Sequence, residues 1–306
     1  MAPIDVLQLV TTPRSFFDQQ VRTLEERGVR CTVVEVPRPE GGRGPESFAR
    51  FYREVLREAV LGDYDLVHAN YGLVGPIALA QPVRPVVLSI WGSEVMGYSN
   101  RLDRVTRFAA RHSDAVIAPS KAVSRELDVP HATIPFGIDT ELFRPMDRER
   151  AREYLGWDPD ERIVLFPYDP DRAVKNYPLA RRVVEGLSMN AELRTVSGLD
   201  YEEMPYVMNA SDALLVTSER ESGPMVAKEA VSCGLPVVST DVGFVSDVLS
   251  GVSNCFTGRS ERSLIDSLEY VLESGQRAEP SDATGGLGLD EMADDILTLY
   301  TTTLRF

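Results

Sequence analysis

We expect this chain to be an α/β protein built as two doubly wound parallel-sheet domains, and three observations predict it. Short, continuous runs of Val, Leu and Ile recur along the sequence, as in strands that are buried on both faces of a parallel sheet. Helix-period segments alternate with these runs, which is the order that βαβ units require. The length of 306 residues suits two domains of about 100–200 residues each.

The first half of the chain alternates strand and helix throughout. Gly28 ends the first helix, because glycine readily takes the left-handed conformation that often follows a helix. The stretch 37–45, PRPEGGRGP, has the composition of a turn-rich loop. The expected strands are 4–10, 31–36, 66–69, 85–90, 115–118 and 132–135, and the expected helices are 15–27, 46–61, 73–80, 102–111 and 120–127.

The second half continues this alternation and contains the stretch 211–249, around which the chain is organised. An apolar strand, a polar loop, a helix and a second apolar strand follow one another there. Pro224 suits the first helical turn, where its missing N–H is not needed, and Gly234 suits the position just past the end. The expected strands are 162–167, 191–196, 213–216, 236–239 and one near 254, and the expected helices are 148–155, 177–186, 202–209, 223–233, 261–273 and 289–304.

The loop before the helix at 223–233 is the first candidate site. It lies at the carboxyl end of a parallel strand, where open α/β sheets bind ligands. The free N–H groups of Met225 and Val226 at the helix start suit a phosphate. Glu221 and Glu229 bracket this position, and an ionised carboxylate can accept two hydrogen bonds from a vicinal diol of a ribose or sugar ring. The alternative is a solvated helix that carries two surface glutamates.

The spacing Glu-x7-Glu in ESGPMVAKE, followed by EAVSCGLPVVSTDVG, resembles the donor-binding signature of retaining family-4 glycosyltransferases. That family has the GT-B fold, in which two Rossmann-like domains face a cleft. The resemblance implies that Glu221 contacts the donor sugar and that Glu229 holds the ribose hydroxyls. It assigns the diphosphate and sugar to the backbone of Ser222, Gly223, Pro224, Met225 and Val226.

Two further loops of the second half match this family. It places Arg and Lys after a strand to neutralise the donor diphosphate, and Arg172 and Lys175 in YDPDRAVKNYPLA are the matching residues. A fork-shaped guanidinium and a compact ammonium suit phosphate oxygens and stabilise charge on the leaving group. With Glu221 they form the expected catalytic set, and the alternative for both cations is surface ion pairing. Gly198 lies in the loop where the family's backbone meets the nucleotide base.

The first half carries a segment that resembles the family's His-Gly-x-Asp, which faces the donor. It reads Trp91-Gly92-Ser93-Glu94, with Trp91 in place of His and Glu94 in place of Asp. Trp91, Gly92 and Glu94 are therefore the expected cleft residues of the first domain. Trp91 either stacks on a sugar face or is structural. After the first strand, Arg14, Phe16 or Phe17 is expected to contact the acceptor, and the alternative for the two Phe is a place in the core.

The resemblance also predicts the domain boundary. IPFGIDTELFRP, at 134–145, resembles the family's hinge, in which Gly137 permits a turn and Asp139 caps the N–H groups after it. We therefore expect an acceptor-side domain at 1–145 and a nucleotide-sugar-binding domain at 146–288. The helix at 289–306 is expected to return to the first domain.

Composition restricts the partners. A net charge of −15 and a pI near 4.7 argue against nucleic acid or an anionic membrane as the main partner, so any membrane contact is at most peripheral. The scarcity of Lys and the excess of acids suggest the hypothesis of a protein from a high-salt cytoplasm, where salt screens the self-repulsion. An Arg-rich, GC-rich coding bias explains the missing Lys equally well but not the excess of acids. Loss of folding below molar salt would support this hypothesis, and full stability in dilute buffer would remove it.

Cysteine spacing and the apolar runs indicate whether the chain binds metal and where in the cell it resides. Cys31, Cys233 and Cys255 have no metal-ligand spacing, so reduced and mostly buried thiols are expected. The first ten residues lack the basic start of a signal peptide, and no apolar run reaches the length of about 20 residues that spans a membrane. A cytoplasmic protein is the resulting expectation.

The sequence therefore predicts a retaining glycosyltransferase that moves a sugar from a UDP- or GDP-sugar to a glycan, lipid-linked or small-molecule acceptor, without metal or cofactor. In this family a phosphate oxygen of the donor is often proposed to take the acceptor's proton, which fits the lack of an obvious base. The main alternative is an inactive sugar-nucleotide-binding or scaffold protein, and a GT-B epimerase or phosphorylase is a further one. The donor's base and sugar, the acceptor and the oligomeric state are left open.

Overall fold

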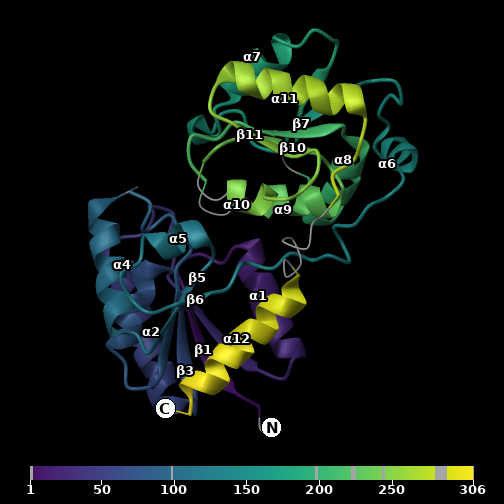
Figure 1. Cartoon of the computed structure of the whole chain (residues 1–306). Helices are drawn as coiled ribbons and strands as arrows, with labels where there is room; N and C mark the ends of the chain where they lie inside the picture. The colour runs from purple at the N-terminus through teal and green to yellow at the C-terminus, as the bar shows by residue number, and fades with distance from the viewer. Residues whose placement is uncertain are drawn as a thin grey trace. The chain divides into compact units, whose positions relative to one another are not determined.

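The computed structural model describes residues 3–97, 99–196, 199–221, 225–242, 245–279 and 288–305. The chain divides into two compact units, of which unit 1 comprises 1–137 and 289–306 and unit 2 comprises 138–288 (Figure 1). Each unit contains one sheet, and every strand pair within these sheets is parallel. The predicted class, α/β with two doubly wound parallel sheets, is confirmed.

The sheet of unit 1 reverses its strand order once. It runs β2-β1-β3-β4-β5-β6, so the chain leaves β1 toward one side and returns to add β3 on the other. The carboxyl ends of β1 and β3 therefore flank a topological switch point, where open α/β sheets bind ligands. The strands are β1 (Asp5–Val10), β2 (Arg30–Glu35), β3 (Leu66–Asn70), β4 (Val86–Ser89), β5 (Ala115–Ala118) and β6 (Ala132–Thr133).

Helices cover both faces of this sheet. The first and last helices of the chain lie side by side on one face, where Leu24, Met292 and Ile296 share a buried cluster with strand residues (Figure 1). The helices of unit 1 are α1 (Ser15–Glu26), α2 (Pro45–Leu61), η1 (Gly72–Val74), α3 (Gly75–Leu79), α4 (Asn100–His112), α5 (Lys121–Arg125) and α12 (Leu289–Thr303).

A buried polar chain ties α12 to the sheet. The Tyr300 hydroxyl lies 2.6 Å from Nδ1 of His68, whose Nε2 lies 2.7 Å from the Ser89 hydroxyl. Gln8 Nε2 donates to the same Tyr300 hydroxyl at 3.4 Å. Burial lowers the pKa of His68 to about 3, so the ring is neutral and accepts at one nitrogen while it donates at the other. This satisfied network makes the docking of α12 specific, because a shifted helix would leave buried groups unpaired.

The sheet of unit 2 also reverses once. Its order is β11-β10-β9-β7-β8, so the switch point lies between β7 and β9. The helices α7 and α11 cover one face (Figure 1). The elements are α6 (Arg148–Leu155), β7 (Ile163–Phe166), η2 (Ala173–Lys175), α7 (Tyr177–Glu185), β8 (Glu192–Thr195), η3 (Tyr201–Glu203), α8 (Met204–Ala210), β9 (Ala213–Val216), α9 (Met225–Ser232), β10 (Val237–Thr240), α10 (Val245–Leu249), β11 (Phe256–Gly258) and α11 (Glu261–Ser274).

Two features of unit 2 differ from the sequence reading. Residues 138–145 group with unit 2, and Phe143 explains this because its ring is 1% exposed within that unit's core. The helix α10 was not expected, since five residues are too few to show a helical period. The buried Arg152 donates to the carbonyls of Ala210 and Pro159, and so fastens α6 to the end of α8 and to the loop before β7.

Candidate functional site

The switch point of unit 2 brings together two residues that the sequence analysis singled out. The loop after β7 carries Lys175, and the loop after β9 carries Glu221. Lys175 is 6% exposed and Glu221 is 8% exposed. The Lys175 ammonium donates a hydrogen bond to Glu221 Oε1, and the two side chains form a buried ion pair.

Three more contacts surround this ion pair. The Ser218 hydroxyl donates to Glu221 Oε1 at 3.0 Å and the Tyr168 hydroxyl does so at 3.4 Å. The Lys175 ammonium also lies 3.8 Å from the centre of the Tyr168 ring, in a cation–π contact. Burial lowers the pKa of Lys175 and the Glu221 charge opposes this, while burial raises the pKa of Tyr168 well above its usual value. The site therefore holds one desolvated cation beside a carboxylate at the strand ends.

Side chains of the neighbouring strand ends hold the two loops in place. The Thr217 hydroxyl donates to the Lys175 carbonyl at 2.9 Å, and the Thr240 hydroxyl donates to the Ser218 carbonyl at 2.7 Å. The Glu219 N–H donates to the Val174 carbonyl at 2.9 Å. A cavity of about 420 Å³ opens at this edge, between Asn176 and Thr240 and beside Ser218. These bonds fix the backbone that carries the ion pair.

Glu229 lies on α9 and is also buried, with 7% of the residue exposed. Its Oε1 accepts a hydrogen bond of 2.9 Å from the Tyr201 hydroxyl. Burial raises the pKa of Glu229 to about 7, against the lowering effect of Tyr201. Its neighbour Lys228 is 3% exposed, and burial lowers the pKa of that ammonium to about 8. The exposed-helix alternative for Glu221 and Glu229 is therefore wrong for both residues.

The other expected donor-binding residues lie in different situations. Arg172 is exposed at the start of η2, and its positive charge helps to lower the pKa of Lys175. Met225 and Val226 form the first turn of α9, as the sequence predicted. Ser222, Gly223, Pro224 and Gly198 lie outside the described residues.

Unit 1 places its three expected residues in one turn after β4. Glu94 is 1% exposed, and its Oε1 accepts hydrogen bonds from the N–H groups of Trp91 (2.8 Å) and Gly72 (3.2 Å). Burial raises the pKa of Glu94 to about 7, and these backbone donors oppose the shift. Gly92 has φ +105°, a conformation that favours glycine. Trp91 is half-buried and packs against aromatic rings.

Sequence reasoning missed Tyr168, Ser218, Tyr201 and Lys228. Tyr168 and Ser218 follow the ends of β7 and β9 by two residues. Their position at the carboxyl edge of the sheet could therefore have been predicted from the expected strands. Tyr201 lies 28 positions before its partner Glu229, and only the packing of η3 brings the two together.

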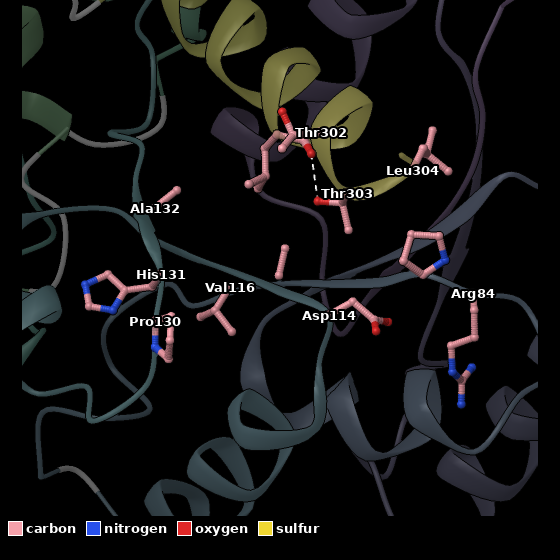
Figure 2. A pocket seen from close by; sticks show the side chains of 12 residues that line it. Arg84, Asp114, Val116, Pro130, His131, Ala132, Thr302, Thr303 and Leu304 are labelled. Atoms are coloured by element: carbon pink, nitrogen blue, oxygen red, sulfur yellow. Dashed lines mark hydrogen bonds between the residues drawn. The ribbon is translucent and has the colours of Figure 1, made fainter. Parts of the chain in front are cut away.

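A larger cavity of about 830 Å³ lies at the opposite, amino edge of the sheet of unit 1. Figure 2 shows Thr302 and Thr303 of α12 and the following Leu304 on one side, and Asp114 and His131 on the other. Its polar side chains are already engaged, since Asp114 Oδ2 accepts from the Val86 N–H and both His131 nitrogens have partners within 2.7 Å. Nothing in this lining defines a ligand, so we do not assign a site to it.

Two absences apply to the described part of the chain. Within it, no group of three or more His, Cys, Asp or Glu side chains is arranged to hold a metal ion. None of the helices in the same residues combines the length and the apolar character needed to cross a membrane.

Family models match both units. The model described as Glycosyltransferase Family 4 matches residues 6–142, and the model described as Glycosyl transferases group 1 matches residues 179–283. A D-inositol 3-phosphate glycosyltransferase of Mycobacterium marinum is 27% identical over 65% of this chain, and the match spans only 54% of that relative's length. The mannosyltransferase LpsB of Rhizobium meliloti is 26% identical over 65% of this chain and 69% of its own length.

Solved structures match nearly the whole chain at low identity. A sucrose-phosphate synthase of Thermosynechococcus elongatus has a TM-score of 0.81 at 16% identity and covers 99% of both chains. Anabaena Alr3699/HepE, solved with UDP-glucose, has a TM-score of 0.67 at 18% identity and covers 99% of this chain and 98% of its own. Together with the two parallel sheets, these likenesses define a protein of GT-B fold. The family models give the narrower assignment, and the chain belongs to the family-4 glycosyltransferases.

Proposed function

We propose that this protein is a retaining glycosyltransferase that transfers a sugar from a UDP- or GDP-sugar to a glycan, lipid-linked or small-molecule acceptor. The observation that carries the proposal is the buried Lys175–Glu221 ion pair at the switch point of unit 2, with the buried Glu229 on α9. A desolvated cation, one carboxylate at a strand end and a second on the following helix suit a ligand that combines a diphosphate with hydroxyl-rich rings. The names of the relatives support the same activity.

Each residue has a proposed role in the transfer. Glu229 accepts hydrogen bonds from the ribose hydroxyls, and the start of α9 at Met225 and Val226 faces the diphosphate. Arg172 and Lys175 stabilise the negative charge that develops on that diphosphate as its bond to the sugar breaks. Glu221 contacts the donor sugar.

The proposed transfer needs no side chain that takes the acceptor's proton, because the leaving group itself accepts it. The bond between the anomeric carbon and the phosphate oxygen breaks, and the acceptor oxygen bonds to the same face of that carbon. The acceptor's proton passes to the leaving phosphate oxygen. No metal or cofactor takes part in the proposed reaction, and the cytoplasmic location stays a prediction.

The test is equilibrium binding of UDP, GDP and ADP in high potassium chloride. Nucleotide sugars of the nucleotide that binds are then assayed for release of the nucleoside diphosphate. We expect one nucleotide to bind and its sugar to turn over. Arg172→Ala should weaken binding of the diphosphate and leave the free nucleoside unaffected, whereas Arg181→Ala, an exposed change on α7, should alter neither. If no nucleotide binds, the proposal fails, and binding without turnover would favour the inactive scaffold.

A further inference from the structure

Aromatic side chains gather at the switch point of unit 1. Trp91, two residues after the end of β4, lies 4.8 Å from the ring of Phe16 and 5.6 Å from the ring of Tyr71, measured between ring centres. Phe17 and Phe136 are buried beneath, with 2% and 8% exposed. We call Phe16, Tyr71 and Trp91, which are all half-buried, the aromatic platform. It stands where β1, β3 and β4 end, which is the edge that open α/β sheets use for ligands.

The backbone beneath the platform is held in costly conformations. Tyr71 has φ +94°, which is unfavourable for a residue with a β-carbon and costs about 1–3 kcal/mol. Glu94 connects the two turns that carry the rings, because its Oε1 accepts from the N–H groups of both Trp91 and Gly72. Strained backbone is typical of functional sites, where it holds side chains in defined positions. The strain at Tyr71 and the buried Glu94 therefore indicate that the positions of the Tyr71 and Trp91 rings are important.

The chemistry of the platform combines ring faces with hydroxyl groups. The Tyr71 and Ser93 hydroxyl oxygens are 3.4 Å apart, which is a long hydrogen bond. Both hydroxyls are therefore able to bond a ligand. A pyranose ring has the matching pattern, with C–H bonds on one face and hydroxyls around its rim, and its C–H groups are attracted to the negative faces of aromatic rings.

Two arginines near this edge, Arg14 and Arg43, do not together form a phosphate site. The Arg43 guanidinium donates to the carbonyls of Thr11 and Val36 and is occupied by them. Arg14 is exposed, and its charge helps to lower the pKa of Tyr71 against the raising effect of burial. A surface of three aromatic rings suits the apolar face of a sugar ring, whereas a phosphate prefers a cluster of guanidinium or ammonium groups.

We propose that the aromatic platform binds the acceptor, that the acceptor is an uncharged sugar ring of a glycan, and that Trp91 stacks on its apolar face. This inference rests on the proposed glycosyltransferase function and names the acceptor class. Trp91 contacts substrate, and Glu94 is a positioning residue that acts through the turn at Trp91. Phe16 and Tyr71 complete the stacking surface.

The test uses Trp91 as its own reporter. The chain has two tryptophans, and Trp157 lies in unit 2 against Arg194, so Trp157→Phe leaves Trp91 as the only fluorescent indole. This variant is titrated with cellobiose, maltose, mannose 6-phosphate and short-chain phosphatidylcholine below its micelle concentration. We expect a saturable change in Trp91 emission with a neutral disaccharide. Preference for the sugar phosphate or for the lipid would overturn the proposal.

Variants separate stacking from folding and from donor binding. Trp91→Ala should raise the KM for the acceptor about three- to tenfold, Trp91→Phe should restore most of the loss, and the nucleotide Kd should not change in either. Glu94→Gln keeps an oxygen for the Trp91 N–H and should retain acceptor binding, whereas Glu94→Ala should resemble Trp91→Ala. Nucleotide binding without any saccharide response would sink this inference alone, while loss of nucleotide binding would point to the proposed function itself.

Discussion

Replacing Glu221 with alanine should destabilise unit 2 by about 3–5 kcal/mol, because it leaves the Lys175 ammonium buried without its counter-charge. Lys175 is 6% exposed and packs against the face of Tyr168, so water cannot readily replace the lost carboxylate. Turnover should fall further than affinity for the bare nucleotide, since Glu221 is proposed to contact the sugar. Equal losses in both would count against that role.

The measurement is denaturant unfolding in high potassium chloride, with Trp157 as the reporter of unit 2. Trp91→Phe provides the background in which Trp157 is the only indole. Glu219→Ala is the matched control, because Glu219 is exposed and only two positions away. A loss of stability as small in Glu221→Ala as in this control would show that the buried pair is not energetically coupled.

A double variant distinguishes the cost of an unpaired charge from the value of the pair. Glu221→Leu with Lys175→Met replaces both charges by apolar groups, and such replacements are often neutral or stabilising. We expect this protein to regain most of the stability that Glu221→Ala loses and to show no transfer activity. Recovered activity would remove both residues from the proposed mechanism.

Replacing Glu229 with glutamine should weaken nucleotide-sugar binding about 100-fold, since hydrogen bonds to a charged group contribute about 1.5–3 kcal/mol each. The carboxamide has nearly the same shape, so unit 2 should stay folded. Glu229 is 7% exposed, and its proposed partners are the two ribose hydroxyls. Affinity unchanged in Glu229→Gln would refute the ribose assignment.

The same carboxyl makes binding depend on pH. Burial raises the pKa of Glu229 to about 7, so the group is largely protonated below that pH and ionised above it. Only the ionised form accepts from both hydroxyls, and affinity should therefore increase as pH rises through about 7. A nucleotide sugar is the suitable ligand, because its diphosphate diester does not titrate in this range.

Two variants test the origin of this pH profile. Glu229→Gln should make the profile flat. Tyr201→Phe removes the hydroxyl that stabilises the ionised form, so the midpoint should move to higher pH. A wild-type profile that stays flat across this range would show that Glu229 does not titrate there.

Most element positions follow from the sequence because their signals are local. The strand at 213–216 and the helix at 148–155 have the bounds that were predicted, and most other elements agree within one to three residues. Apolar runs and helical periods each need only neighbouring residues to be recognised. The exceptions are short elements such as α10, for which five residues contain too little periodicity.

The candidate site could be predicted only in part, because local spacing can be recognised in a sequence and long-range contacts cannot. Glu221, Glu229 and Lys175 lie in motifs whose spacing is local, so the sequence could name them. It could not show that Lys175 bonds Glu221, because these residues are 46 positions apart and meet only when the loops after β7 and β9 fold over the switch point.

The sequence by itself determined the order of strands and helices, the fold class and the loops that carry the candidate chemistry. Only the tertiary structure decided which of those side chains lose water and which acquire partners. Tyr300 forms a hydrogen bond with His68, which lies 232 positions earlier in the chain. The buried Glu94 accepts a hydrogen bond from the Trp91 N–H and so holds the turn that carries Trp91. Burial and pairing set the charge and orientation of a side chain, and both depend on residues that approach from elsewhere in the chain.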